Sequence, residues 1–527
     1  MEFKKIIGST ALTLILSITG GAVPTENVCA TDMVHQSEDG STVPTENYKL
    51  SIIKKLEKNG RLHLQNKFEI LNGKLSVRMP RGDKKKALDI IAIICEMTWV
   101  TSIVFNDYQF TSLQGLCSLQ NLKKLCMCDA DITSLSGLEG CTNLENLHLC
   151  NCESLVSLDG IPENLKEELI LCNCKRLVSL NGVPASLKKL NMSITTVTSL
   201  SGLKGCTNLE EIRLSAGVAS LNGLEGCMNL EILDMTGCRS LVNLNGVPAS
   251  LKKLSISHSS VESLSGLEGC TNLEVLCLSD CASLTNLDRM PTSTRLQTLH
   301  MYSIFIKSLN GLEGCTNLEV LCLINCASLT SLDGMPANIT SLSLSGTNVQ
   351  SLSCLEGCTN LGVLNMKGCV SMSSLEGMPN IPSLKVLDLS ISQVKSLSVL
   401  KHFNGLKVLD LSCSHVKSLK VLKCCTNLEE LNLDGCALLE SLGGIQAVSK
   451  SLKSLNLSRS CVKSLKALKH RFTNLENLSM SWCLELEKSS FDSFMRFITI
   501  KTFPKLRGVY TSDRGTFCFD WYKSSLQ

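Results

Sequence analysis

One spacing of leucines returns through most of this 527-residue chain and limits how it can fold. From Leu122 onward, the pattern L-x-x-L-x-L-x-x-C, or the same pattern ending in Ser or Thr, recurs every 21 to 24 residues. The seventeen first positions are Leu122, Leu144, Leu165, Leu187, Leu209, Leu230, Leu251, Leu273, Leu296, Leu318, Ile339, Leu361, Leu384, Leu406, Leu428, Leu452 and Leu475. Because one such unit cannot bury its own leucines, the copies must stack on one another.

The centre of each copy, x-L-x-L-x, is predicted to be a short β-strand. Alternate side chains of a strand point to opposite faces, so both leucines point inward and their neighbours line a shared sheet. About 22 residues per copy leave no room for a long helix on the return path. We therefore expect little α-helix between Leu122 and Trp482.

This pattern resembles the leucine-rich-repeat superfamily, in its SDS22-like and internalin-like forms with Cys-bearing units. The resemblance covers roughly residues 100–483 and rests on seventeen copies of the motif. It implies an α/β leucine-rich-repeat solenoid, capped at both ends. In that fold one long parallel β-sheet lines the concave face of a curved horseshoe, and few helices lie on the convex face.

The N-terminus is typical of an export signal. Lys4 and Lys5 precede an apolar stretch from Ile6 to Ile18, and Val28 and Ala30 form the spaced pair of small or aliphatic residues that a signal peptidase favours. We interpret residues 1–30 as a signal peptide and the polar residues 31–47 as a flexible leader. The stretch is too short to span a bilayer, so no stable membrane insertion is expected after cleavage.

Both flanks of the repeats differ from them in composition. In residues 48–99, helices are predicted over Leu50–Lys58 and Lys84–Met97, with a hairpin through Ile70 and Val77 between them. We interpret this section as an N-terminal cap, followed by the repeats over 100–483. Residues 484–527 are rich in Phe and are interpreted as the C-terminal cap, because an open solenoid end exposes a layer of leucines.

The chain has 29 cysteines, and most of them keep the register of the repeat. One set occupies the position that ends the motif, and another lies three residues before a first-position leucine; Cys281 and Cys270 are examples. We expect these to be buried thiols that bond weakly to the turn backbone.

Cys128, Cys150 and Cys172 fall at one position in three consecutive copies, which we expect to lie on the outer side of the sheet. Three interpretations remain: a bridge, a soft-metal site completed by Asp129 or His148, and chance thiols on a tolerant surface. The last is favoured, because no second Cys-x-x-C or His pair supports zinc, and we predict no metal site.

The composition argues against several classes of function. A net charge of +3 from 51 basic and 48 acidic residues excludes binding to nucleic acid by gross charge. The chain has no P-loop, no nucleophile elbow and no metalloprotease motif, so neither an enzyme nor a cofactor is expected. Carboxylates on the strand face, at Asp234, Asp388, Asp410 and Asp434, are interpreted as solvated.

A preformed curved sheet suits binding of another protein, whose identity the sequence does not give. The outward strand positions carry a mild apolar row with a few larger side chains. The predicted partner-binding residues are Arg213, Val275, His300, Tyr302, Val320, Val363, Val386, Val408, Arg459 and Trp482. We interpret the chain as a monomeric, exported interaction scaffold, either a surface protein or a secreted effector directed at a host. The alternative is an intracellular adaptor of the phosphatase, cyclase or ubiquitin-ligase recognition type, or an effector delivered into a host cytoplasm.

Overall fold

The computed structural model describes residues 45–59, 65, 68–71, 74–78, 84–97, 100–106, 111–214, 217–292, 295–469, 472–498, 503–511 and 517–518. The predicted signal peptide and most of the predicted leader lie outside these residues. The chain forms two compact units, Met1–Leu273 and Glu274–Gln527. Each unit is described by itself.

The first unit begins with the segment that we interpreted as a cap. It contains helix α3 (Thr45–Lys58), strands β1 (Phe68–Leu71) and β2 (Lys74–Arg78), helix α4 (Lys84–Cys95) and strand β3 (Ser102–Asn106). Strands β1 and β2 form the expected antiparallel hairpin, and β2 pairs with β3 in parallel. Helix α3 starts at Thr45, so it reaches into the range predicted to be the leader.

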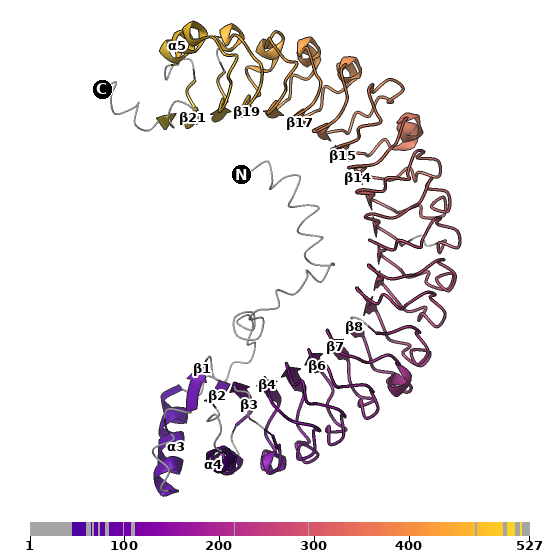
Figure 1. Ribbon diagram of the computed structural model, residues 1–527, viewed down its shortest axis with the longest axis vertical. Helices are drawn as coiled ribbons and strands as arrows, with labels where there is room; N and C mark the ends of the chain where they lie inside the picture. Colours follow the sequence, from indigo (N-terminus) through magenta and orange to yellow (C-terminus); the bar gives the residue numbers. More distant parts are fainter. Residues whose placement is uncertain are drawn as a thin grey trace. The chain divides into compact units, whose positions relative to one another are not determined.

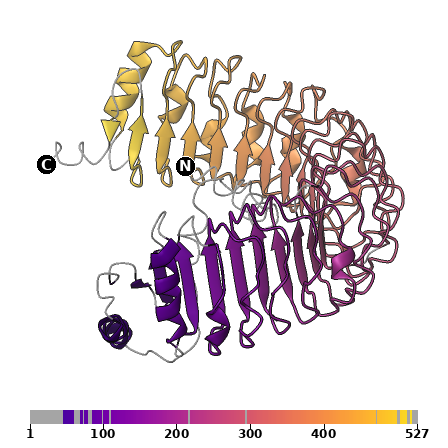
Figure 2. The same ribbon diagram turned by 60° about the horizontal axis from the view of Figure 1, so that its bottom comes forward.

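The repeats of the first unit continue this sheet in parallel (Figure 2). Their strands are β4 (Lys124–Cys128), β5 (Asn146–Cys150), β6 (Glu168–Cys172), β7 (Lys189–Met192), β8 (Glu211–Leu214), β9 (Ile232–Asp234) and β10 (Lys253–Ser255). The 3₁₀ helices η2 (Leu116–Ser118) and η3 (Ser201–Leu203) lie on the return paths.

The second unit repeats the same arrangement. Its strands are β11 (Val275–Cys277), β12 (Thr298–His300), β13 (Val320–Cys322), β14 (Ser341–Ser343), β15 (Val363–Asn365), β16 (Val386–Asp388), β17 (Val408–Asp410), β18 (Glu430–Asn432), β19 (Ser454–Asn456), β20 (Asn477–Ser479) and β21 (Gly508–Tyr510). All of these pair in parallel with their neighbours, and β22 (Phe517–Cys518) closes the edge antiparallel to β21.

The return paths of the second unit carry 3₁₀ helices. These are η4 (Ser353–Gly357), η5 (Ser398–His402), η6 (Lys420–Cys424), η7 (Ile445–Val448) and η8 (Lys466–Leu468), and α5 (Lys488–Phe497) follows the last repeat. Figure 1 shows the strands of this unit along its inner side and the 3₁₀ helices along its outer side. Between Leu122 and Trp482 the described residues contain 3₁₀ helices but no α-helix, which confirms the sequence expectation.

The strands β4 to β20 correspond to the seventeen copies of the motif. Both inward aliphatic side chains of each copy lie in the core; Leu276 and Leu278, for example, are fully buried. At the C-terminal end Phe472, Phe494 and Phe503 pack together, and the rings of Phe472 and Phe503 stack with centroids 5.9 Å apart. No helix within the described residues is long and apolar enough to cross a membrane.

Each repeat has a residue in the left-handed backbone conformation within three residues of the end of its strand. Glycine fills this position at Gly217, Gly237, Gly346, Gly368 and Gly435. Elsewhere the position holds Asp129, Asn151, Asn173, Ile194, His258, Asp280, Ser303, Asn325, Ile391, Cys413, Arg459 or Trp482. Its amide donates to the next repeat, as from Asp280 N to Tyr302 O at 2.7 Å. The sequence analysis missed this feature, although the Asn, Asp and Gly residues there are a signal for it.

Candidate functional site

The predicted valine row exists in the second unit. Strand pairing places Val275, Val320 and Val363 in one line across β11 to β15, separated by Thr298 and Ser341. Val386 and Val408 extend the line across β16 and β17. Val275, Val320 and Val363 are half-buried, whereas Val386 and Val408 are only 8% and 5% exposed. The accessible part of the row is therefore its N-terminal half.

His300 lies in a second row, between Cys277 and Cys322 on the neighbouring strands. It is 2% exposed, and neither ring nitrogen has a hydrogen-bond partner. Burial lowers the pKa of His300 to about 4, so the ring is neutral at pH 7. The ring of Tyr302, which is half-buried, meets it edge to face with centroids 5.9 Å apart. The side chain of His300 is therefore covered by its neighbours and offers a partner almost no accessible surface.

The same row ends in polar side chains. Asn365, Asp388, Asp410 and Asn432 follow one another in register across β15 to β18. Asp388 and Asp410 are buried, at 6% and 7% exposed, which corrects our interpretation of these two carboxylates as solvated. Asn432 Nδ2 on the neighbouring strand donates to Asp410 Oδ2 at 3.0 Å, and Ser390 N in the same repeat donates to Asp388 Oδ1 at 2.8 Å. Burial raises the pKa of Asp388.

Three of the predicted binding residues are exposed. Trp482 is 56% exposed, and Arg459, which forms an ion pair with Asp434, occupies the same left-handed position one repeat earlier. Both belong to the second unit, together with all five valines, His300 and Tyr302. Arg213 belongs to the first unit, where its Nε donates to Glu211 Oε1 at 2.6 Å. The structure therefore groups the other nine predicted residues in one unit.

The cysteines that end the motif are buried, as expected. They form a ladder in which several thiols donate to a backbone carbonyl of the preceding repeat. Examples are Cys369 Sγ to Leu344 O at 3.0 Å and Cys436 Sγ to Leu411 O at 3.1 Å. The second set behaves similarly, as in Cys141 Sγ to Leu116 O at 3.1 Å. These thiols hold the turns together.

Cys128, Cys150 and Cys172 do not lie on an open surface, contrary to the favoured interpretation. Cys128 and Cys150 are 7% and 8% exposed and pack with Cys126, while Cys172 is half-buried against them. The closely spaced strands let the side chains of one repeat cover those of the next. Within the described part of the chain, no group of three or more His, Cys, Asp or Glu side chains is arranged to hold a metal ion.

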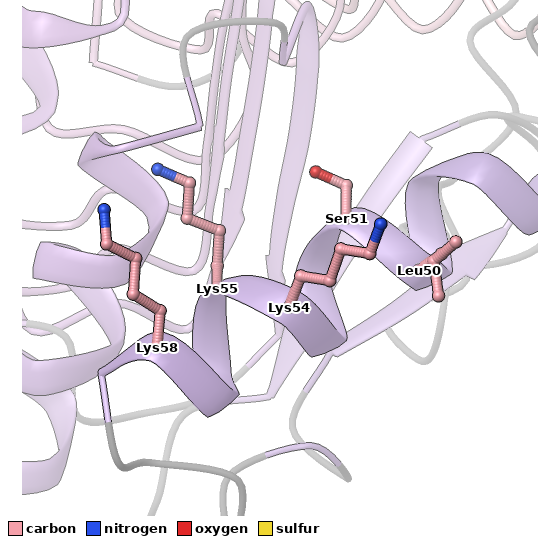
Figure 3. A pocket seen from close by; sticks show the side chains of 5 residues that line it. All are labelled: Leu50, Ser51, Lys54, Lys55 and Lys58. Carbon is pink, nitrogen blue, oxygen red and sulfur yellow. The ribbon is translucent and has the colours of Figure 1, made fainter.

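A separate shallow pocket lies on α3, and the sequence analysis did not single it out. It is lined by Leu50, Ser51, Lys54, Lys55 and Lys58. Figure 3 shows the side chains of the three lysines along this helix. Lys55 Nζ is paired with Glu96 Oε2 at 3.2 Å, and this hydrogen bond lowers the pKa of Glu96.

The period, the parallel strands and the short return paths define a leucine-rich-repeat solenoid. Comparison with solved structures agrees: YopM from Yersinia enterocolitica is similar over 83% of this chain and 95% of its own, with TM-score 0.55 and 21% identity. A structure of a TLR13–ssRNA13 complex matches over 72% of this chain and 54% of that chain, with TM-score 0.48 and 18% identity. The Leptospira interrogans protein LIC12759 matches over 79% and 85%, with TM-score 0.42 and 16% identity.

The similarity to YopM supports the fold that the strands and their pairing define. No protein-family model matches the sequence. No curated protein matches it either.

Proposed function

We propose that this protein is an exported, monomeric interaction scaffold that binds another protein through the strand face of its second unit. The observation that carries the proposal is the line of half-buried valines at Val275, Val320 and Val363, which strand pairing places in register. Apolar side chains on every second strand of a sheet, with the small polar Thr298 and Ser341 between them, offer a partner a surface that needs little ordering. β-Propensity alone also favours valine in strands, so the proposal needs a direct test.

The proposed interface has three parts: buried polar residues, the line of valines, and two exposed side chains beyond the strands, which form its rim. The buried part is formed by His300, Asp388 and Asp410, whose low exposure leaves a partner little area to contact. The valine line provides apolar area. Arg459 and Trp482 extend from the rim, and residues of these two types are enriched among the strongest contributors to protein interfaces. The predicted export signal supports a partner outside the producing cell, on a host or neighbouring cell.

The test is capture of a partner from a host or neighbouring-cell extract. The variant carries Val320→Glu and Val363→Glu, which place carboxylates in the valine line. Its matched control carries Val370→Glu, because Val370 belongs to the same repeat as Val363 but is 54% exposed and lies outside the strand. We expect the control to retain the partner that the parent captures and the double variant to lose it, with both melting near the parent temperature. Equal capture by the folded double variant would contradict the proposed interface.

A further inference from the structure

Three cysteines lie side by side on adjacent strands of the first unit. Strand pairing sets Cys128 of β4 opposite Cys150 of β5, and Cys150 opposite Cys172 of β6. Adjacent strands are ~4.8 Å apart. This spacing falls within the Cα separations of roughly 4.4–6.8 Å at which disulfides form. Each neighbouring pair is therefore within reach of a bridge without a change in the strand order.

The three thiols differ in accessibility. Cys172 is half-buried, whereas Cys150 and Cys128 are 8% and 7% exposed. A reagent in solution therefore meets Cys172 first, and Cys150, its in-register neighbour on β5, can react with the product.

We propose that Cys172 and Cys150 form a thiol-oxidation site that a small disulfide, such as oxidised glutathione, converts into an intramolecular bridge. The Cys172 thiolate attacks the reagent, forms a mixed disulfide and releases one glutathione thiolate. The Cys150 thiolate then attacks Cys172 Sγ, which forms the bridge and releases the second glutathione. Two protein thiols are oxidised, the reagent is reduced to two thiols, and the two protein protons end on glutathione.

A histidine lies beside this pair. His148 precedes Cys150 by two residues on β5, so the two side chains share a face of the sheet. Its Nε2 lies 2.8 Å from Glu168 Oε2 on β6, and the imidazole is 3% exposed. Burial lowers the pKa of His148, but hydrogen bonds with Cys126 and Glu168 outweigh that effect and raise it. The raised pKa enlarges the protonated fraction of His148, and a protonated imidazole beside a thiol favours the thiolate that exchange requires.

Other thiols of the chain provide internal comparisons. Cys152 and Cys174 also occupy neighbouring repeats, but both are fully buried, and Cys174 has a pKa raised by its hydrogen bond with Cys152 and by burial. Cys413 is exposed, and the equivalent positions of the flanking repeats hold Ile391 and Gly435. We expect Cys413 to stop at a glutathione adduct, because neither flanking repeat has a cysteine at the equivalent position.

The experiment treats the reduced, folded full chain with oxidised glutathione, blocks the remaining thiols, and maps tryptic peptides by mass spectrometry without reduction. Trypsin cleaves after Lys124, Lys166 and Lys175, so a Cys150–Cys172 bridge joins peptide 125–166 to peptide 167–175. Fragmentation between Cys172 and Cys174 identifies which of the two carries the link. Peptide 125–166 also contains Cys126, Cys128, Cys141 and Cys152, so fragmentation on both sides of Cys150 identifies the second linked cysteine. We expect the link at Cys172, a glutathione adduct at Cys413, and reversal of both by dithiothreitol.

Two variants separate this site from the buried pair. Cys172→Ser abolishes the link between the two peptides, whereas Cys174→Ser retains it. A link that survives in Cys172→Ser, or a wild-type protein in which Cys172 carries only glutathione while Cys413 is modified, overturns the proposal. The wild-type fragmentation decides the assignment even where a variant folds poorly.

Discussion

The thiol of Cys326 donates a hydrogen bond of 2.8 Å to the backbone carbonyl of Met301, in the preceding repeat. Both residues are fully buried, so the carbonyl has no access to water. The bond ties one turn to the next without a disulfide. A cysteine at this inward turn position therefore fills the core and also supplies the hydrogen bond that the buried carbonyl needs.

Replacement of Cys326 should therefore destabilise the protein. Cys326→Ala removes the donor and leaves a buried carbonyl unpaired, which costs about 1–3 kcal/mol of unfolding free energy. Cys326→Leu costs a similar ~1–3 kcal/mol through overpacking. Urea titration measures both, with Cys117→Ser as control because Cys117 is exposed. If the two Cys326 variants unfold at the same urea concentration as the control, the ladder does not stabilise the fold.

The left-handed position of each repeat makes a second prediction. At Gly368 φ is +69°, and an added Cβ would have 3.8 Å to its nearest neighbour, Gly346 N. Gly368→Ala should thus lose about 1–2 kcal/mol from backbone conformation alone. Gly368→Asn should lose less, because Asn tolerates this region. Thermal unfolding of the pair is decisive, and an alanine variant as stable as the parent would show that the position is not constrained.

Buried His300 makes stability depend on pH. Its pKa is about 4 in the folded protein against 6.5 when solvated, so the unfolded chain binds the proton more tightly. Stability from this group is full above pH 6.5 and declines as pH falls towards 4, by at most about 3 kcal/mol. In His300→Leu, the free energy of unfolding should fall less between pH 7 and pH 4 than it does in the parent. Chemical unfolding at each pH measures this difference. An unchanged difference between parent and variant across this range would mean that His300 is solvated.

The predicted export signal can be tested directly. We predict that the mature chain begins near Thr31 and is found outside the cytoplasm, because a charged start, an apolar stretch and a cleavage site occur in that order. N-terminal sequencing of protein from the culture medium or periplasm gives the answer. Intact Met1 there, or protein confined to the cytosol, would contradict the prediction.

The leucine spacing was sufficient to predict the strands, their parallel order and the core, because each repeat packs between two repeats of the same pattern. It also predicted the register of the valine row. The sequence analysis did not predict the burial of His300, Asp388 and Asp410, because that depends on how closely neighbouring strands cover one another. The pairing of His148 with Glu168 was missed as well, since the two residues come from different repeats.

Site-specific photo-crosslinking tests the proposed binding face most directly. A photoreactive residue at Val363 lies in the valine line, and the same residue at Val370 lies in the same repeat but outside the strand. In the presence of the captured partner, we expect a crosslinked product from position 363 and none from position 370. A product from position 370 alone, with 363 unreactive in a folded protein, would contradict binding through the strand face.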